Sequence, residues 1–204
     1  MSEPTTSADT LHEIAPGILH WTIRDERIDF RSEAYAVATD LGTIVLDPLP
    51  LTEAAYDELG PVAAIYLTGR FHQRAASSFR DRFGARVHAP AGASGFDEQP
   101  DERFTDGHRA AEGLIALDRP GPSSPHYVFR LDATGGCSAL FCGDLLMRGD
   151  DGPFALVPDE HHDDPVRTRD SVRRLLEPPV DLLCPAHGAP ALTDATQRIR
   201  EALR

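Results

Sequence analysis

The chain has 204 residues, of which 41% are hydrophobic and 26% charged, the composition of a globular protein with one core. Its net charge is −13, with 33 acidic against 20 basic residues, which argues against a nucleic-acid-binding surface. The sequence shows neither a run of about 20 apolar residues nor an apolar leader, so we expect no membrane span and no secretion. Three cysteines are too few for a disulfide scaffold, and a cytoplasmic protein is predicted.

The first half of the chain predicts strands that alternate with helices after a flexible polar tail over residues 1–12. Asp40, Leu41 and Gly42 form a short turn between two apolar runs, which is typical of a hairpin. Gly60 and Gly84 follow helical patterns as stop signals. The predicted elements are strands over 14–23, 34–38, 43–46, 62–67 and 86–89, and helices over 51–59 and 75–83.

The second half predicts another β layer and two further helices within the same single domain, 1–204. Residues 91–105 are rich in Gly, Asp and Pro and are interpreted as a surface loop. Asp164 and Pro165 suit the cap and first turn of a helix. The remaining predicted elements are strands over 114–117, 126–131, 138–142 and 182–184, and helices over 166–176 and 194–203.

Four short motifs lie where the predicted strands end. Thr68 to Arg74, with the sequence Thr-Gly-Arg-Phe-His-Gln-Arg, directly follows a strand. Later, His126 follows a Pro-Gly turn, Gly143-Asp144 ends a strand, and His187 lies in a Pro-Ala-His-Gly loop. Their order and spacing resemble the metallo-β-lactamase superfamily. The resemblance implies an α/β (α+β) fold, a four-layer αββα sandwich of two mixed β-sheets.

The first metal motif of that superfamily, Thr-His-x-His-x-Asp-His, is degenerate here. Gly69 and Phe71 stand where two histidines are expected, Gln73 replaces the aspartate, and Arg74 replaces the third histidine. His72 occupies a spacer position. The resemblance therefore predicts a site with an incomplete set of metal ligands.

The surviving residues imply a hydrolase with at most one divalent metal. The resemblance implies His126, Asp144 and His187 as metal ligands, and Asp144 is also expected to be catalytic. His72 is the nearby candidate for a second catalytic residue, as a general base, or for a fourth ligand. Two histidines and a carboxylate suit zinc, and iron or manganese as well. A metal that lowers the pKa of water and polarises a carbonyl is sufficient to hydrolyse a small ester, thioester or phosphorylated substrate.

A metal-free alternative stays open at this point. Arg74 is expected to take the place of a cation and pair with Asp144. Arg70 and Arg74 lie at the N-terminus of a helix that is expected to start near His72, where they suit a carboxylate or phosphate. The chain is then a pseudoenzyme or an anion-binding module, and a homodimeric scaffold is a further alternative. His161 and His162, in an acidic loop, are interpreted as solvated, with a surface metal site as the alternative.

Overall fold

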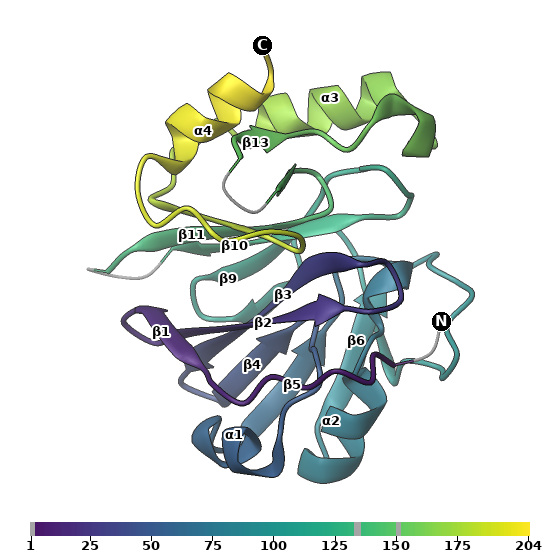
Figure 1. Ribbon diagram of the computed structural model, residues 1–204, viewed down its shortest axis with the longest axis vertical. Coiled ribbons are helices and arrows are strands. Elements are labelled where there is room, and N and C mark those ends of the chain that lie inside the picture. The colour runs from purple at the N-terminus through teal and green to yellow at the C-terminus, as the bar shows by residue number, and fades with distance from the viewer. Residues whose placement is uncertain (1–2, 133–135, 150–151) are drawn as a thin grey trace.

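Two large β-sheets face each other in the computed structural model, which describes residues 3–132, 136–149 and 152–204 (Figure 1). Helices α1 (Glu53–Glu58) and α2 (Ala76–Phe83) lie outside one sheet, and α3 (Pro165–Arg174) and α4 (Ala195–Ala202) lie outside the other. This arrangement confirms the predicted four-layer αββα sandwich. No helix among the described residues is both long and apolar enough to cross a membrane.

The first sheet contains seven strands in chain order. Its first three pairs are antiparallel, and its last three pairs are parallel. Helices α1 and α2 form the crossovers from β4 to β5 and from β5 to β6, and the segment 91–101, which contains no helix, connects β6 to β7. The strands are β1 (His12–Ala15), β2 (Ile18–Asp25), β3 (Phe30–Thr39), β4 (Gly42–Leu46), β5 (Val62–Tyr66), β6 (Arg86–Pro90) and β7 (Glu102–Phe104).

The second sheet has five strands and is mixed as well. Its strand order is β14 (Leu182–Pro185), β11 (Ser138–Gly143), β10 (Tyr127–Asp132), β9 (Leu114–Asp118) and β8 (Arg109–Ala111). Strand β14 joins β11 in parallel, and the other pairs are antiparallel. A small two-stranded sheet pairs β12 (Met147–Arg148) with β13 (Phe154–Ala155).

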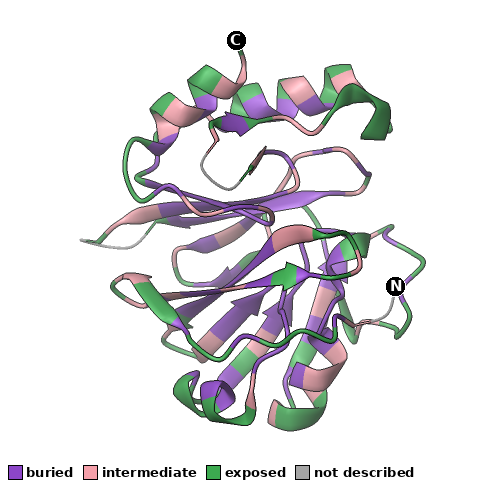
Figure 2. Ribbon diagram, viewed as in Figure 1, coloured by how far each residue is buried: buried purple, intermediate pink, exposed green. Residues whose placement is uncertain are grey.

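Three clusters of buried apolar side chains lie between the four layers. Figure 2 shows buried residues along the strands of both sheets. Trp21 stacks on Phe79 between the first sheet and α2, with ring centroids 6.1 Å apart. Tyr35 of β3 meets Phe141 of β11 edge to face across the central space, at 5.3 Å. Val172 of α3, fully buried, lies in the third space. These contacts hold the two sheets in one fixed orientation.

Two expectations about the N-terminal region need correction. Pro16 and Gly17 split the first predicted strand into β1 and β2, and Gly17 adopts a φ of +76°. Residues 1–2 of the predicted flexible tail lie outside the described part of the chain, and the rest of that segment contacts the fold at two positions. Ala8 pairs with Leu51 as an isolated bridge, and Leu11 packs into the core beneath the sheet. Burial of these small apolar side chains stabilises the segment.

Main-chain hydrogen bonds join the two sheets at the edge where the predicted motifs meet. The amide of Tyr127 donates to the carbonyl of Thr68 at 2.8 Å, just beyond the end of β5. The amide of Glu33 in β3 donates to the carbonyl of Ala186 at 2.9 Å, just beyond β14. Segments far apart in sequence are thereby fixed side by side, and the motif residues lie along this seam.

Candidate functional site

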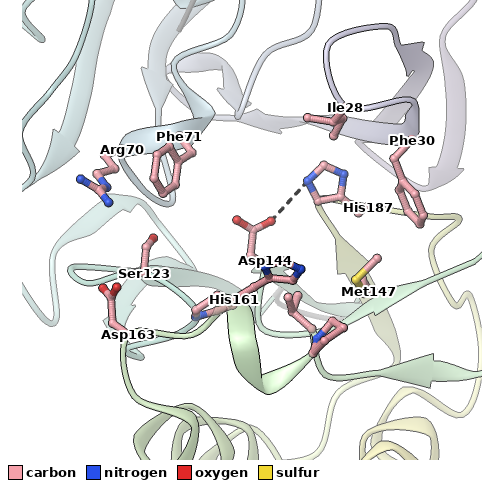
Figure 3. Close-up of a pocket in the computed structure, with 13 residues that line it drawn as sticks. Ile28, Phe30, Arg70, Phe71, Ser123, Asp144, Met147, His161, Asp163 and His187 are labelled. Carbon is pink, nitrogen blue, oxygen red and sulfur yellow. Dashed lines mark ion pairs between the residues drawn. The ribbon is translucent and has the colours of Figure 1, made fainter.

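Asp144, His187 and His72 form a compact cluster at this seam. One possible metal-ligating atom of each residue lies within 4.8 Å of the others. The Nε2 atom of His72 is 3.1 Å from Oδ1 of Asp144, and Nε2 of His187 is 3.4 Å from the same oxygen. Figure 3 shows Asp144 and His187 turned toward each other at the base of a pocket.

His72 enters the cluster because the chain makes a 3-10 turn over Arg70–His72 directly after β5. The imidazole is buried, and its Nδ1 lies 2.9 Å from Oδ2 of Asp47 and 2.6 Å from Oγ1 of Thr68. Asp47 follows β4 and also accepts hydrogen bonds from the amide and hydroxyl of Thr68, at 2.8 and 2.7 Å. This network fixes the ring and directs Nε2 toward Asp144.

The charges of the cluster depend on one another. Burial alone would lower the pKa of His72, but the carboxylates of Asp144 and Asp47 raise it to about 9. Burial would raise the pKa of Asp144, and the charge and hydrogen bond of His72 hold it well below the ordinary range instead. Burial lowers the pKa of His187 to about 4 against the opposing attraction of Asp144. The result is a carboxylate between a cationic and a neutral imidazole.

His187 is oriented by the first sheet. Its Nδ1 lies 3.3 Å from the carbonyl of Arg31 and 3.3 Å from Oγ of Ser32, both in β3. A neutral ring that donates from Nδ1 to the Arg31 carbonyl presents the lone pair of Nε2 to Asp144. The Nε2 atom is thus directed at the cluster by contacts outside it.

His126 has a different role from the predicted metal ligand. The Nδ1–H group of His126 donates to the carbonyl of Arg119 at 3.0 Å, and Nε2 accepts from the amide of Asp144 at 3.2 Å. Both ring nitrogens are engaged, and burial lowers the pKa of the ring, which keeps it neutral. The structure therefore brings together Asp144, His187 and His72, while His126 holds the main chain of Asp144 in place.

The expected ion pair between Arg74 and Asp144 is wrong. The Arg74 side chain is buried and donates to the carbonyls of Glu33, Asp47 and Ala186 at 2.9, 3.3 and 3.4 Å. Among the described residues, Asp144 has the protonated ring of His72 within ion-pair distance and does not have the guanidinium of Arg74 there. The guanidinium therefore hydrogen-bonds to three carbonyls that belong to both halves of the molecule, and not to the carboxylate of Asp144.

The predicted anion site on Arg70 and Arg74 is therefore reduced to Arg70. Arg74 does not line the pocket, and the helix that was expected near His72 begins only at Ala76 as α2. The Arg70 guanidinium is exposed and lies over the ring of Phe71, 4.3 Å from its centroid. Phe71 itself is 41% exposed at the pocket rim. A small anion would meet one arginine here.

Gln73 and the buried cysteines lie outside the chemistry of the site. The amide group of Gln73 donates to the carbonyl of Glu98 at 2.6 Å and accepts from the amide of Asp97 at 2.8 Å, so it fixes a surface loop. Cys142 is fully buried, and burial raises the pKa of its thiol to about 12. Cys184 is equally buried. These thiols are core residues rather than nucleophiles.

The pocket above the cluster has a volume of about 700 Å³. In Figure 3, Arg70, Ser123 and Asp163 lie on one side of Asp144, and apolar side chains such as Phe30 lie on the other. The pocket is lined by Ile28, Phe30, Arg70, Phe71, Pro122, Ser123, Asp144, Met147, Val157, Pro158, His161, Asp163 and His187. Its shape suits a small molecule with one apolar and one polar end.

Three residues have roles at the site that were not predicted from the sequence. Asp47 and Thr68 hold His72, and His161 lines the pocket. A signal for Asp47 was present, because an aspartate directly after an apolar strand lies at the edge of the sheet where Thr68 also lies. His161 was interpreted as solvated, because its loop reaches the pocket only through tertiary contacts.

Comparisons with known proteins agree with this architecture. Residues 10–202 match the family profile described as the metallo-beta-lactamase superfamily. A metallo-beta-lactamase from Pontibacter korlensis is 18% identical, with 95% of this chain and 98% of that chain covered and a TM-score of 0.72. A protein solved in a di-iron-bound form is 24% identical over 83% of this chain and 94% of its own, with a TM-score of 0.65.

A third similar structure comes from Cronobacter sakazakii. This metallo-beta-lactamase from Cronobacter sakazakii, described by a HARLDQ motif, is 16% identical over 87% of this chain and 80% of its own, with a TM-score of 0.64. No curated protein sequence matches the chain. The family match spans nearly the whole length and agrees with the observed sandwich, so the chain belongs to the metallo-β-lactamase superfamily.

Proposed function

We propose that the protein hydrolyses a small ester or thioester in the pocket above Asp144, with at most one divalent metal held by His72, Asp144 and His187. Membership of the superfamily supports a hydrolase-like protein. The observation that carries the proposal is the convergence of two imidazole Nε2 atoms on one carboxylate oxygen, at 3.1 and 3.4 Å. Two histidines with one carboxylate form a common catalytic metal set.

The surroundings of these three residues fit a metal site. Ligand histidines usually donate from the second ring nitrogen to a carboxylate or carbonyl, which orients the ring. Asp47 provides that partner for His72, and the carbonyl of Arg31 provides it for His187. A lone pair on Nε2 of His187 that faces a carboxylate oxygen is unfavourable unless a cation lies between them. The donor set is therefore arranged around a positive charge.

A single metal is favoured over two. Arg74 is buried near the cluster, and its charge stabilises the ionised forms of Asp47 and Asp144. Both nitrogens of His126 are engaged elsewhere. A second cation would lack ligands and would be repelled by the guanidinium. Zinc fits the ligand set, and the di-iron-bound structural relative is a reason to test iron as well.

Each side chain has a defined task in the proposed reaction. A metal would supply a Lewis acid that polarises the substrate carbonyl. Asp47 and Thr68 hold the ring of His72, and His126 holds the main chain of Asp144. Phe30 and the other apolar lining residues exclude water from one side of the substrate.

Metal analysis tests this proposal directly. Protein purified without chelator and then dialysed against zinc, iron(II) or manganese(II) should hold up to one equivalent. His72→Ala, Asp144→Ala and His187→Ala should each abolish binding, whereas Arg70→Gln, at the pocket rim, should retain it. A metal content below a tenth of an equivalent in all cases, or an unchanged content in His72→Ala, would refute the assigned ligand set.

A metal-free anion-binding protein is the second candidate, and one observation favours it. His72 lies between the carboxylates of Asp47 and Asp144, so a protonated ring neutralises the site without a metal. Arg70 then remains as an exposed cation in the pocket, and it makes no ion pair with any described residue. Calorimetry with butyrate or inorganic phosphate on metal-free protein distinguishes the two candidates. Binding that is lost in Arg70→Gln, with no metal uptake, would support the second.

The proposal also covers the cellular compartment of the protein and its binding partners. We place the protein in the cytoplasm, where the free thiols of Cys137, Cys142 and Cys184 would persist. A small molecule is the proposed partner, and homodimer formation stays a prediction that sedimentation analysis can test.

A further inference from the structure

The loop before α3 forms one wall of the pocket. It includes a 3-10 turn over Asp159–His161, and Val157, His161 and Asp163 all line the cavity together with Asp144 and His187. Figure 3 shows His161 among the side chains that line the same pocket as Asp144. This wall was predicted from the sequence to be a solvated acidic loop, and it contributes none of the proposed metal ligands.

The loop is held in this position at two points. The amide of Asp163 donates to the carbonyl of Pro122 at 2.8 Å, and Oδ2 of Asp163 accepts from the amide of Ser124 at 3.0 Å. The next residue, Asp164, accepts from the amide of Arg167 at 3.0 Å and caps α3. One side of the loop is thus fixed to the turn that leads into β10, and the other is fixed to a helix.

His161 differs from the other histidines at this site in its exposure and in the hydrogen bonding of its ring. His72 and His126 are buried with both ring nitrogens engaged, and His187 is held by β3 through Nδ1. The His161 side chain is exposed, and neither ring nitrogen has a hydrogen-bond partner among the residues that the structure describes. An imidazole that lines a pocket and has no structural partner is available to exchange a proton with a ligand.

We propose that His161 donates a proton to the leaving group of the substrate, and that Asp163 is a positioning residue that holds it there. This inference rests on the proposed hydrolase. A water molecule forms a new bond to the carbonyl carbon and releases one of its protons to solvent. The bond from that carbon to the leaving oxygen breaks, and that oxygen keeps the electron pair. The His161 imidazolium transfers its proton to the leaving oxygen, and the neutral ring regains a proton from solvent.

The dependence on the leaving group tests the assignment. A 4-nitrophenolate leaves without protonation, whereas an ethoxide needs a proton, so 4-nitrophenyl butyrate and ethyl butyrate form a suitable pair of probes. In His161→Gln, kcat for ethyl butyrate should fall about 100-fold or more, the usual contribution of general acid catalysis. The value for 4-nitrophenyl butyrate should change less than about threefold. Glu160→Gln, on the same turn but away from the pocket lining, is the matched control and should behave as wild type.

The positioning role of Asp163 has its own readout. Asp163→Ala removes the acceptor for the Ser124 amide and should lower kcat for ethyl butyrate selectively. Asp163→Asn keeps an acceptor oxygen and should restore most of the loss. The positioning role is wrong if Asp163→Ala lowers kcat by the same factor for both esters, or if Asp163→Asn loses as much activity as Asp163→Ala.

The experiment distinguishes failure of the proposed hydrolase from failure of the proposed role of His161. If the wild-type protein with its metal content measured hydrolyses neither ester above the buffer rate, the proposed hydrolase is refuted, and the proton donor with it. If wild type is active and His161→Gln retains the metal content but loses equal activity on both esters, or none, only the role of His161 is refuted.

Discussion

His72 lies between two carboxylates that belong to different sheets. Asp47 follows β4 of the first sheet, and Asp144 follows β11 of the second. Each carboxylate contacts one ring nitrogen, so the imidazole links the two halves of the molecule through charge-assisted hydrogen bonds. A histidine at this position combines a structural and a chemical task, which explains why it is buried although it belongs to the functional site.

Arg74 should matter more for stability than for ligand binding. Arg74→Met removes the charged donors from the carbonyls of Glu33, Asp47 and Ala186 and leaves them buried. We expect a loss of about 3 kcal/mol in the free energy of unfolding, measured by urea titration. Arg70→Met, an exposed control, should change it by less than about 0.5 kcal/mol. A loss below about 1 kcal/mol in Arg74→Met would contradict this role.

Asp25 should make the free energy of unfolding depend on pH in the acidic range. It is buried, and although burial raises its pKa, hydrogen bonds from Arg27 at 2.8 and 2.6 Å hold the pKa below the ordinary value of 3.8. A lowered pKa in the folded state stabilises the fold above pH 3.8, and this contribution disappears as pH falls through the folded-state pKa. Asp25→Asn should therefore be less stable at pH 7 and lose less stability on acidification.

The control for this prediction is Asp29→Asn, because Asp29 is an exposed neighbour whose ion pair with Arg24 lies in solvent. Its unfolding free energy should follow that of wild type from pH 7 to the acid limit. Parallel pH profiles for wild type and Asp25→Asn would show that Arg27 does not shift the Asp25 carboxyl.

The candidate site was predictable in part at the scale of residues. Asp144 and His187 could be found because each follows a strand end in a short recognisable motif. His72 was placed as a spacer because a motif is compared along the chain, whereas the 3-10 turn over Arg70–His72 rotates the ring into the cluster. The engagement of His126 by Arg119 depends on tertiary structure and leaves no trace in sequence.

At the scale of elements, Gly143 determines how β11 ends. Its φ is +55°, and a Cβ atom at this position would lie 2.4 Å from Nε2 of His126. Gly143→Ala should therefore displace the His126 ring and destabilise the protein by about 2 kcal/mol more than the backbone strain alone. Gly84→Ala is the matched control, since Gly84 has a φ of +65° and no atom near the added Cβ.

Thermal or urea unfolding of the two variants measures the difference. Gly84→Ala should lose only the cost of a left-handed alanine, about 1 to 2 kcal/mol. Equal losses at Gly143 and Gly84 would mean that the contact with His126 relaxes without cost, and that the strand end does not depend on a glycine.

Most elements with strong patterns were predicted correctly, whereas the strands of two or three residues were missed. The hairpin of β3 and β4 and the succession β5, α2, β6 follow from apolar runs and glycine stops. The strand β7 has three residues within the segment predicted as a loop, and it exists because β6 offers it a parallel partner. Such pairing is a property of the assembled sheet, which local sequence patterns do not encode.

At the scale of the whole molecule, the net charge of −13 should make stability sensitive to salt. Repulsion among the excess carboxylates opposes the compact state, and ions screen it. We expect the melting temperature to rise when sodium chloride increases from about 20 mM to about 500 mM, where the Debye length becomes shorter than the distance between most surface charges. A melting temperature that falls over this range would show that the surface ion pairs outweigh the repulsion.

Main-chain hydrogen bonds contribute to the seam between the sheets, as in the bonds from Tyr127 to Thr68 and from Glu33 to Ala186. Bonds of this kind are indifferent to side-chain identity, so the cavity retains its shape when its lining changes. At Gly69, the backbone is extended with a φ of −164°, and an added Cβ would meet nothing closer than 3.8 Å. The scaffold can therefore accept a histidine there, which makes it a starting point for installing new ligands by directed evolution.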